Sequence, residues 1–304
     1  MSEENQVEQP QKSEFKDEVP KEQSRVERGD TPFTFGQRVL KSDDDIWNHN
    51  ACSLVLTEHL FFLDLYMTQP AKYWDQFYRN NKANFFKDRK WLRVEFPALY
   101  DATLPDAGPR RILEVGCGAG NTLFPVLQAN QNPELRITGV DFSKQAVEIV
   151  RTSEQFDATY AEAHVWDLAE PTGALPQNIE PHSVDIIVMI FVFSALAPDQ
   201  WKQAVANLER LLKPGGQILF RDYGRYDLTQ LRFKGGRLLD ENFYIRGDGT
   251  RVYFFTEQEL EEIFGTVFTV KKVATDRRLM VNRQRRIKMF RIWLQANFEK
   301  PLEQ

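Results

Sequence analysis

One stretch decides the fold, and it reads ILEVGCGAG from Ile112 to Gly120. Its first four residues form a largely apolar run, typical of a short strand buried in a parallel sheet. Three glycines then occupy every second position, and residues 121–130 read as a helix. Glycine lets a backbone turn sharply and approach a ligand closely. The stretch therefore predicts a strand, a glycine loop and a helix in that order.

The rest of the chain continues this alternation of strands and helices. Apolar runs that predict strands are followed by amphipathic segments that predict helices, with Ser143 as the expected N-cap of one of them. The pattern predicts an α/β fold, Rossmann-like, with a mostly parallel sheet and helices on both faces. The expected strands are residues 136–140, 159–165, 184–193 and 217–221, and the expected helices are residues 143–151 and 201–212.

Composition excludes several classes of protein. The chain has 304 residues, of which 42% are hydrophobic and 27% charged, an ordinary soluble globular balance. No run of 18 apolar residues and no apolar leader is visible, so neither a membrane span nor secretion is expected. With two cysteines a disulfide framework is not expected, and a reducing compartment fits. The expected location is the cytoplasm, with the nucleus as an additional possibility.

Three parts of the chain differ in composition. Residues 1–32 form an expected disordered acidic tail, because their first 30 positions carry nine acidic and five basic side chains. Residues 33–109 form a basic and aromatic extension that would carry a lid over a ligand. Within this extension, residues 55–67 and parts of 71–96 read as helical, and residues 97–109 as a linker. Residues 110–304 form the expected α/β domain.

The glycine spacing favours one class of ligand. Dinucleotide sites usually space their glycines as G-x-G-x-x-G, whereas here Gly120 comes one residue early and Glu114 precedes the first glycine. This variant suits S-adenosylmethionine, whose amino-acid end has no pyrophosphate. A tight turn without a ligand is the alternative.

Two further carboxylates follow predicted strands. Asp141 lies 23 positions after Gly118, where a carboxylate can accept both ribose hydroxyls of a nucleoside. Asp167 and Leu168 end the next strand, where they can contact an adenine edge. The alternatives are a helix N-cap for Asp141 and an ordinary loop carboxylate for Asp167. Three suitable groups at three successive strand ends nevertheless favour a nucleoside site.

Two basic segments suggest a nucleic-acid partner. Residues 72–93 contain seven Lys and Arg beside two Asp, and residues 271–291 contain nine beside Asp276 alone. Aromatic residues are interleaved with the cations in the first segment, and aromatic rings stack on unpaired bases while cations hold phosphates. RNA is therefore the expected partner, and DNA is not. A solvated charged surface is the alternative.

Several longer motifs resemble one family, the tRNA N3-methylcytidine methyltransferases, over roughly residues 33–300. The resemblance implies the class I methyltransferase fold with an N-terminal tRNA-binding extension, S-adenosyl-L-methionine as cofactor and no metal. Residues 35–40 and 276–283 look like the branch that acts on threonine tRNA. One departure stands at Cys52 and Ser53, where the family pattern has Trp-Asp, so the role of this element stays open. The motifs are YWDQFY (73–78), NFFKDRKWL (84–92), ILEVGCGAG (112–120), DFS (141–143), IFV (190–192), FRDYG (220–224) and the segment from Glu241 to Phe255.

The resemblance also implies cofactor contacts along the chain. Trp74 and Tyr78 would cover the cofactor, because an aromatic face attracts a sulfonium ion. A helix packed on the core is the alternative for these two aromatics. The implied cofactor contacts are Trp74, Tyr78, Gly116, Asp141, Asp167, Leu168 and Ile190.

The reaction itself suggests further residues. Methylation at cytosine N3 leaves a positive charge on the base, which a carboxylate would stabilise. Asp222 follows a strand end and is the candidate catalytic residue, with a salt bridge to Arg221 or Arg225 as the alternative. Tyr223 is expected to stack on the flipped-out base. Arg251 is expected to hold a phosphate, and Arg221, Arg277 and Arg278 are the other expected substrate contacts, with Arg285 and Arg286 in the same cluster.

Other classes of protein stay open at this point. A small-molecule methyltransferase would share the α/β core but lack the basic extension and the C-terminal arginines. An RNA-binding protein without catalysis would keep the basic segments but lose the cofactor residues. The glycine spacing disfavours a nicotinamide oxidoreductase. An accessory protein for substrate selection and a prior modification of the anticodon loop are also left open.

Overall fold

The computed structural model describes residues 33–35, 38–40, 66–82, 88–89, 91–282 and 287–302. The chain divides into two units, residues 1–32 and Phe33–Gln304, and all of the described residues belong to the second. The expected disordered tail lies outside the described residues, as does most of the helix expected at 55–67. Two short strands at the start of the second unit, β1 (Phe33–Phe35) and β2 (Arg38–Leu40), pair antiparallel.

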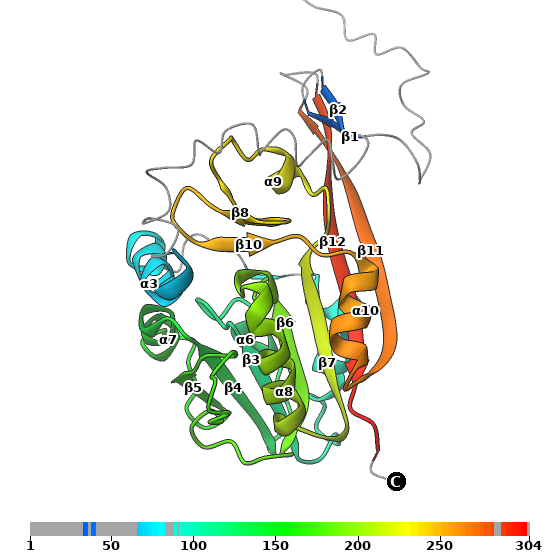
Figure 1. The fold of residues 1–304 in the computed structure, drawn as a ribbon. Coiled ribbons are helices and arrows are strands. Elements are labelled where there is room, and N and C mark those ends of the chain that lie inside the picture. Colours follow the sequence, from blue (N-terminus) through cyan, green and yellow to red (C-terminus); the bar gives the residue numbers. More distant parts are fainter. Residues whose placement is uncertain are drawn as a thin grey trace, which may run out of the picture. The chain divides into compact units, whose positions relative to one another are not determined.

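A seven-stranded sheet forms the centre of this unit (Figure 1). Its strand order is β11-β12-β7-β6-β3-β4-β5, in which the five strands from β7 to β5 run parallel. An antiparallel hairpin of β11 and β12 extends the sheet beyond β7. The strands are β3 (Arg110–Val115), β4 (Leu135–Asp141), β5 (Ala161–Val165), β6 (Val184–Ile190), β7 (Leu212–Tyr223), β11 (Thr269–Asn282) and β12 (Ile287–Glu299).

Helices cover both faces of the sheet because the central strands are apolar on both faces. Along β3, Leu113 packs into one core and Ile112 into the other, as expected for alternating side chains. The first core includes Leu208 of α8 and Phe264 of α10, and the second includes Leu123 of α6. The predicted α/β class with a mostly parallel sheet is therefore confirmed. The covering helices are α6 (Leu123–Gln128), α7 (Lys144–Arg151), α8 (Trp201–Leu211) and α10 (Glu257–Gly265).

The linker expected at residues 97–109 is wrong in its first half. Residues 92–101 form two short helices, α4 (Leu92–Glu95) and α5 (Pro97–Asp101), and Leu99 is completely buried. Proline fits the first turn of α5, where its missing N–H is not needed. The second half is also held in place, because the Asn132 side-chain amide donates to the carbonyl of Gly108 over 2.8 Å. This segment therefore packs with the domain rather than connecting two parts.

Some element boundaries differ from the expected ones. Strand β6 ends at Ile190, and Phe191 has a φ of 59°, a left-handed conformation that ends the strand before the short helix η3 (Phe193–Ala195). Strand β7 already begins at Leu212, so residues 213–216 belong to the strand that was expected to begin at residue 217. The predicted N-cap Ser143 is confirmed, because its side chain accepts a hydrogen bond from the Ala146 N–H.

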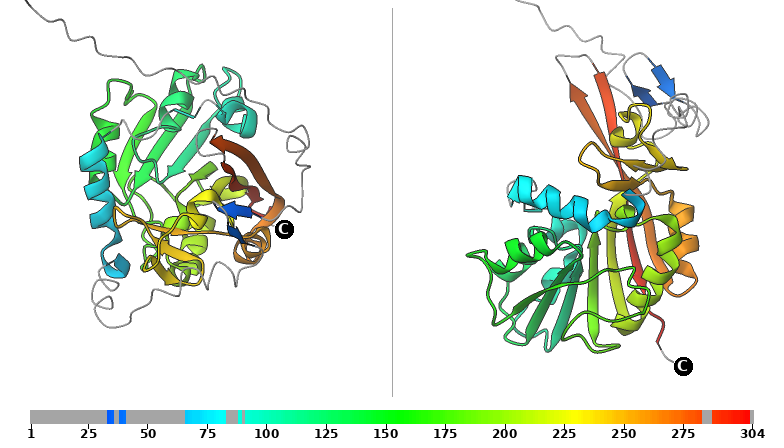
Figure 2. Two further views of the ribbon diagram at one scale, coloured as in Figure 1. Left: turned by 90° about the horizontal axis from the view of Figure 1, so that it is seen from above. Right: turned by 60° about the vertical axis from the view of Figure 1, so that its left-hand side comes forward.

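Two structures lie over the carboxyl ends of the parallel strands. One is the helix α3 (Pro70–Asn81), and the other is a small antiparallel sheet, seen together at the same end of the central sheet in Figure 2. Among the described residues, no helix is long and apolar enough to cross a membrane. The small sheet consists of β8 (Leu238–Asp240), β9 (Phe243–Ile245) and β10 (Arg251–Tyr253), preceded by the short helix α9 (Leu228–Leu231).

Candidate active site

A cleft opens at the carboxyl ends of the parallel strands. Ligands of open α/β sheets bind at this edge, where the strand order reverses. Six of the seven expected cofactor residues line the cleft together, although they come from four separate segments. The seventh, Ile190, is buried at the end of β6, and its neighbour Phe191 lines the cleft instead. The six are Trp74, Tyr78, Gly116, Asp141, Asp167 and Leu168.

The glycine loop requires glycine at two positions for two different neighbours. Gly116 has a φ of 67°, and a Cβ there would lie 2.5 Å from Cγ2 of Val192. Gly118 has a φ of 53°, and a Cβ there would lie 2.5 Å from the hydroxyl of Tyr78. Any side chain at these positions would strain the backbone and collide with the cleft wall. The loop therefore stays thin where it borders the cleft.

Asp141 holds this loop in place. Its Oδ2 accepts a hydrogen bond from the Gly118 N–H over 3.0 Å, and its Oδ1 accepts one from the Ser143 N–H over 2.9 Å. The N-cap of α7 is Ser143, so the expected alternative of Asp141 as the N-cap is wrong. Burial raises the pKa of Asp141 to about 6 despite these two donors. Each oxygen keeps a second lone pair for a ligand in the cleft.

Glu114 supports the loop from beneath, a role that the sequence analysis missed. Its Oε2 accepts a hydrogen bond from the Leu123 N–H over 2.9 Å, and its Oε1 lies 3.7 Å from the guanidinium of Arg89. Burial raises its pKa to about 7. The sequence signal was present, since an acidic residue directly precedes the loop. The sequence did not indicate that Glu114, at the end of β3, binds the first turn of α6.

Helix α3 is fastened over the cleft by one carboxylate. Asp75 accepts hydrogen bonds from the Ser143 hydroxyl over 2.6 Å and from the Gln145 N–H over 3.3 Å, both at the start of α7. Tyr78 is buried against Ala146, and its ring stacks with Trp74 at a centroid distance of 6.0 Å. The two aromatics thus pack on the core and also line the cleft. The expected cofactor lid and the alternative of core packing therefore each describe part of their environment.

Asp222 lies at the end of β7, with no exposed surface. Its Oδ2 accepts a hydrogen bond from the Ser194 N–H over 2.9 Å, and its Oδ1 accepts one from the Tyr223 N–H over 2.8 Å. The alternative of a salt bridge to Arg221 or Arg225 is wrong, since Arg221 pairs with Asp276 and Arg225 with Glu259. Burial raises the pKa of Asp222 to about 6. Its charge can act at short range, but its oxygens are enclosed.

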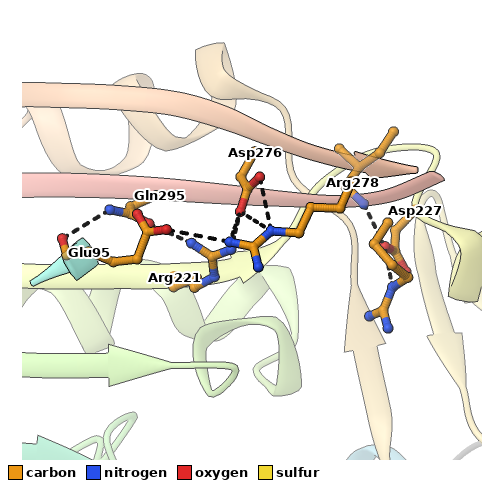
Figure 3. A network of polar contacts seen from close by, with 8 residues as sticks. Glu95, Arg221, Asp227, Asp276, Arg278 and Gln295 are labelled. Atoms are coloured by element: carbon orange, nitrogen blue, oxygen red, sulfur yellow. Dashed lines mark hydrogen bonds and ion pairs between the residues drawn. The ribbon is translucent and has the colours of Figure 1, made fainter. Parts of the chain in front are cut away.

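Arg221 is also buried, which corrects its expected role as a direct substrate contact. Its guanidinium lies between the rings of Trp91 and Trp293, 4.9 Å from each centroid. It donates to Asp276 and to Gln295, as Figure 3 shows. With 1% of its surface exposed, it cannot reach an RNA bound outside. It joins β7 to the hairpin of β11 and β12.

Arg251 is the second expected contact that the structure places inside. Its Nε donates to the carbonyl of Ala195 over 3.1 Å, and one terminal nitrogen donates to the Gln200 side chain over 3.1 Å. Burial lowers the pKa of this guanidinium to about 10. Because its donors face protein acceptors, it supports the η3 turn, and the expectation that it holds a phosphate is corrected accordingly.

The remaining substrate candidates lie nearer the surface. Arg277 is exposed on β11, whereas its neighbour Arg278 pairs with Asp276 and, over 3.4 Å, with Glu95. Tyr223 is half-buried, and its ring is tilted against that of Phe191 at 4.9 Å. Arg285 and Arg286 lie outside the described residues, as does the FFK part of the aromatic and basic segment. Phe191 was not predicted to line the cleft, because nothing in the sequence distinguishes it from the apolar strand before it.

Comparison with known proteins now places this cleft in a family. A methyltransferase domain model matches residues 113–218. A tRNA N(3)-methylcytidine methyltransferase of Schizosaccharomyces pombe is 50% identical, over 88% of this chain and 92% of the relative. The chain belongs to this family. A tRNA(Thr) (cytosine(32)-N(3))-methyltransferase of Saccharomyces cerevisiae is 56% identical over 96% of this chain, which spans about half of that relative's length. The predicted family and class of enzyme are confirmed.

Solved structures support the fold of this family member. A putative methyltransferase of Haloferax volcanii, solved with the Trm112 methyltransferase activator, matches with a TM-score of 0.54 and 16% identity. The match covers 78% of this chain and 99% of that one. A protein of Pyrococcus horikoshii matches with a TM-score of 0.53 and 17% identity, over 74% and 98% of the two chains. At these identities the likeness concerns the fold alone, and it confirms the predicted methyltransferase architecture.

Proposed function

We propose that this chain transfers a methyl group from S-adenosyl-L-methionine to N3 of cytidine 32 in the anticodon loop of threonine tRNA. The observation that carries the proposal is the convergence of six expected cofactor residues on one cleft, in a chain of this family. Position 32 and threonine tRNA are those named for the Saccharomyces cerevisiae relative, and residues 35–40 and 276–283 also resemble the threonine-tRNA branch. The proposed substrate class is tRNA, and the proposed tRNA within it is threonine tRNA.

The cleft fits the cofactor in shape and in charge. When bound, S-adenosyl-L-methionine supplies an activated methyl group on a sulfonium ion. The thin loop at Gly116 and Gly118 lets a ligand approach the backbone, and Asp141 offers carboxylate lone pairs to ribose hydroxyls. The half-exposed ring of Trp74 lines the cleft and can face a cation. These residues bind and orient the cofactor.

The base needs alignment more than a strong general base. Cytosine N3 carries an in-plane lone pair and is unprotonated at neutral pH, so it can attack without losing a proton first. The protein therefore contributes mainly proximity and orientation, which hold two reactants in line. Tyr223 and Phe191 offer aromatic surface for the base next to the cleft. The enclosed charge of Asp222 stabilises the cation that forms on the base.

A further proposed tRNA contact comes from the C-terminal arginines. Arg277 is exposed on the hairpin of β11 and β12, and Arg283, Arg285 and Arg286 follow it in the sequence. The Haloferax volcanii protein was solved with an activator protein, but that likeness concerns the fold alone. An accessory protein for substrate selection therefore stays a prediction. The cytoplasmic location also stays a prediction.

Nucleoside mass spectrometry tests the proposal directly. The full chain is incubated with S-adenosyl-L-methionine and separately transcribed threonine tRNAs, one carrying cytidine and one carrying uridine at position 32. We expect N3-methylcytidine in the first tRNA and none in the second. Asp141→Ala is the matched catalytic control and should lose most of the product. Equal methylation of both tRNAs, or methylation of small molecules alone, would overturn the proposed substrate.

A further inference from the structure

Four arginines lie in or beside β7 and β10, and three of them are buried, namely Arg221, Arg225 and Arg251. Arg221 is enclosed by two indole rings and Asp276, and Arg225 donates to both oxygens of Glu259 over 2.9 and 3.0 Å. Arg251 donates to protein carbonyl and amide oxygens. Each of these guanidiniums already has acceptors, so none can take a phosphate without breaking a buried contact.

Arg246 is the fourth arginine, and its surroundings differ. It is half-buried, and its guanidinium carbon lies 5.3 Å from the centroid of the Tyr223 ring. Among the described residues, its side chain donates one long hydrogen bond of 3.4 Å, to the Thr250 hydroxyl. Within the part of the chain that the structure describes, no carboxylate forms an ion pair with it. Its positive charge, next to the Tyr223 ring, is therefore available to an anionic ligand.

The backbone around Arg246 is fixed by a tight turn. The Arg246 N–H donates to the Thr250 carbonyl over 2.7 Å, and the Gly249 N–H donates to the Arg246 carbonyl over 3.0 Å. Asp248 accepts from both the N–H and the hydroxyl of Thr250, over 2.9 and 2.7 Å. Rigid placement reduces the entropy lost when a side chain binds. The turn thus presents a preorganised cation.

The same turn contacts the helix that covers the cofactor cleft. A Cβ on Gly249 would lie 2.3 Å from Cδ1 of Tyr73, so the turn rests directly against α3 beside Trp74. The turn between β9 and β10 therefore contacts α3 through Gly249 and the Tyr223 ring through Arg246. The charge of Arg246 also acts on the enclosed Asp222, whose pKa it lowers against the larger effect of burial. Arg246 itself covers a face of the Tyr223 ring, so a nucleotide at the cleft would meet its guanidinium beside that ring.

We propose that Arg246 binds a phosphodiester next to the target cytidine and thereby positions that nucleotide at the cleft. Planar guanidinium groups match phosphate oxygens in a two-pronged contact. This inference rests on the proposed function, because it takes the substrate to be a tRNA. It assigns the phosphate contact to Arg246 in place of the enclosed Arg251.

A double-mutant cycle between protein and RNA tests the contact. We compare wild type with Arg246→Ala on threonine tRNA, and on the same tRNA carrying a neutral methylphosphonate on either side of cytidine 32. Arg246→Ala should lower kcat/KM by about 10–100-fold on normal tRNA, as for a lost charged hydrogen bond. It should reduce the salt slope of tRNA binding by roughly one. On the methylphosphonate at the contacted position, wild type and variant should become equal.

Two further variants separate this role from a structural one. Arg246→Lys keeps the charge without the planar fork, so it should recover part of the loss. Arg136→Ala removes an exposed arginine near the start of β4, at the opposite end of that strand from Asp141, and should leave kcat/KM unchanged. S-adenosylhomocysteine affinity should stay within twofold in all three variants. Losses that add in the cycle, or an unchanged salt slope, would overturn the phosphate contact. Failure of the proposed function looks different, because wild type itself would then methylate no tRNA.

Discussion

The two halves of the cleft edge are built in different ways. On the side of β3 and β4, side chains hold nearby backbone: Glu114 binds an N–H nine residues on, and Asp141 binds one two residues on and another 23 back. On the side of β7 and β12, the buried arginines Arg221 and Arg225 are held by carboxylates that are distant in sequence. Arg221, for example, pairs with Asp276, which is 55 residues away in sequence.

This difference decides what each half can tolerate. A carboxylate that accepts backbone N–H groups fixes a local loop, so its loss is expected to affect chiefly the ligand that the loop contacts. A buried arginine between two indoles and a carboxylate joins β7 to the β11–β12 hairpin, so its loss should affect the fold. The first half is thus expected to show changes in cofactor affinity, and the second to show changes in stability or in rate.

The largest expected effect is a loss of methyl-transfer rate when Asp222, at the end of β7, is changed. Asp222→Asn removes the enclosed charge and should lower the single-turnover rate by about 10²–10³-fold, the scale of one electrostatic contribution. Cofactor and tRNA affinities should change little, because the compensated charge develops only during reaction. The new amide must also place its NH₂ against one of two backbone donors, Ser194 or Tyr223.

The clash between the new amide and these backbone donors could itself destabilise the protein, so the experiment includes a control for folding. Ser194→Ala keeps the Asp222 charge and the Ser194 N–H while it removes the neighbouring hydroxyl, so it should retain most of the rate. If the rate losses of the two variants simply follow their losses of unfolding free energy, Asp222 is a structural residue. The β7 side would then contribute stability alone.

The next prediction concerns stability on the same side. Arg221→Met keeps an apolar stem between Trp91 and Trp293 but leaves Asp276 without its buried partner. The free energy of unfolding should fall by about 2 kcal/mol, since the hydrogen bonds to Gln295 and Asp276 are lost while the part-exposed Asp276 keeps its pair with Arg278. Urea denaturation measures this fall. Arg277→Met is the matched control on the exposed neighbour and should change it by less than about 0.5 kcal/mol. Equal effects would erase the difference between the two arginines.

Asp141→Ala examines the glycine-loop side. It removes the acceptor for Gly118 and the expected partner of the ribose, so cofactor binding should weaken by about 1–3 kcal/mol. Calorimetry with S-adenosylhomocysteine measures this change. Asp185→Ala, at the opposite end of the parallel strands, removes a carboxylate that pairs with Lys213 and should leave cofactor affinity unchanged. An unaltered affinity in Asp141→Ala would contradict the assignment of the loop.

The raised pKa of Asp141 predicts a pH dependence on this side. With a pKa of about 6, only a tenth of the carboxyl is ionised at about pH 5, so cofactor affinity should fall about tenfold between pH 7.5 and 5. Without ligand, the Asp141 carboxyl binds more protons in the folded protein than in the unfolded chain between about pH 4 and 6. Its contribution to the unfolding free energy should therefore fall as pH rises through that window, and the wild type minus Asp141→Ala difference measures it. A flat affinity profile in wild type would show that the ionised form is not required.

The smallest effect concerns the exposed part of the hairpin. Arg277→Ala should weaken tRNA binding modestly and reduce its salt slope by roughly one, as for one lost phosphate contact. Cofactor affinity should not change. Arg278→Ala is an informative comparison, because this side chain already pairs with Asp276 and Glu95 and is expected to change the slope less. Identical slopes for wild type and Arg277→Ala would make the exposed arginine a solvated residue only.

The sequence by itself determined the sheet and the cofactor side. A glycine loop after an apolar strand, and carboxylates after the next two strands, lie close together because parallel strands end at one edge. Asp141, Asp167 and Gly116 could thus be placed without any knowledge of distant contacts. Ser143 as the N-cap of α7 was readable for the same reason, since capping joins residues three positions apart.

Only the tertiary structure decided which arginines face the ligand side. Arginine is an exposed residue by composition, yet Arg221 and Arg251 are enclosed by aromatic rings and acceptors that come from other segments. Arg246 carries no motif that separates it from them, and its place over Tyr223 arises from the turn between β9 and β10. Local patterns fix strands, turns and caps, whereas burial of a long charged side chain depends on partners far away in sequence.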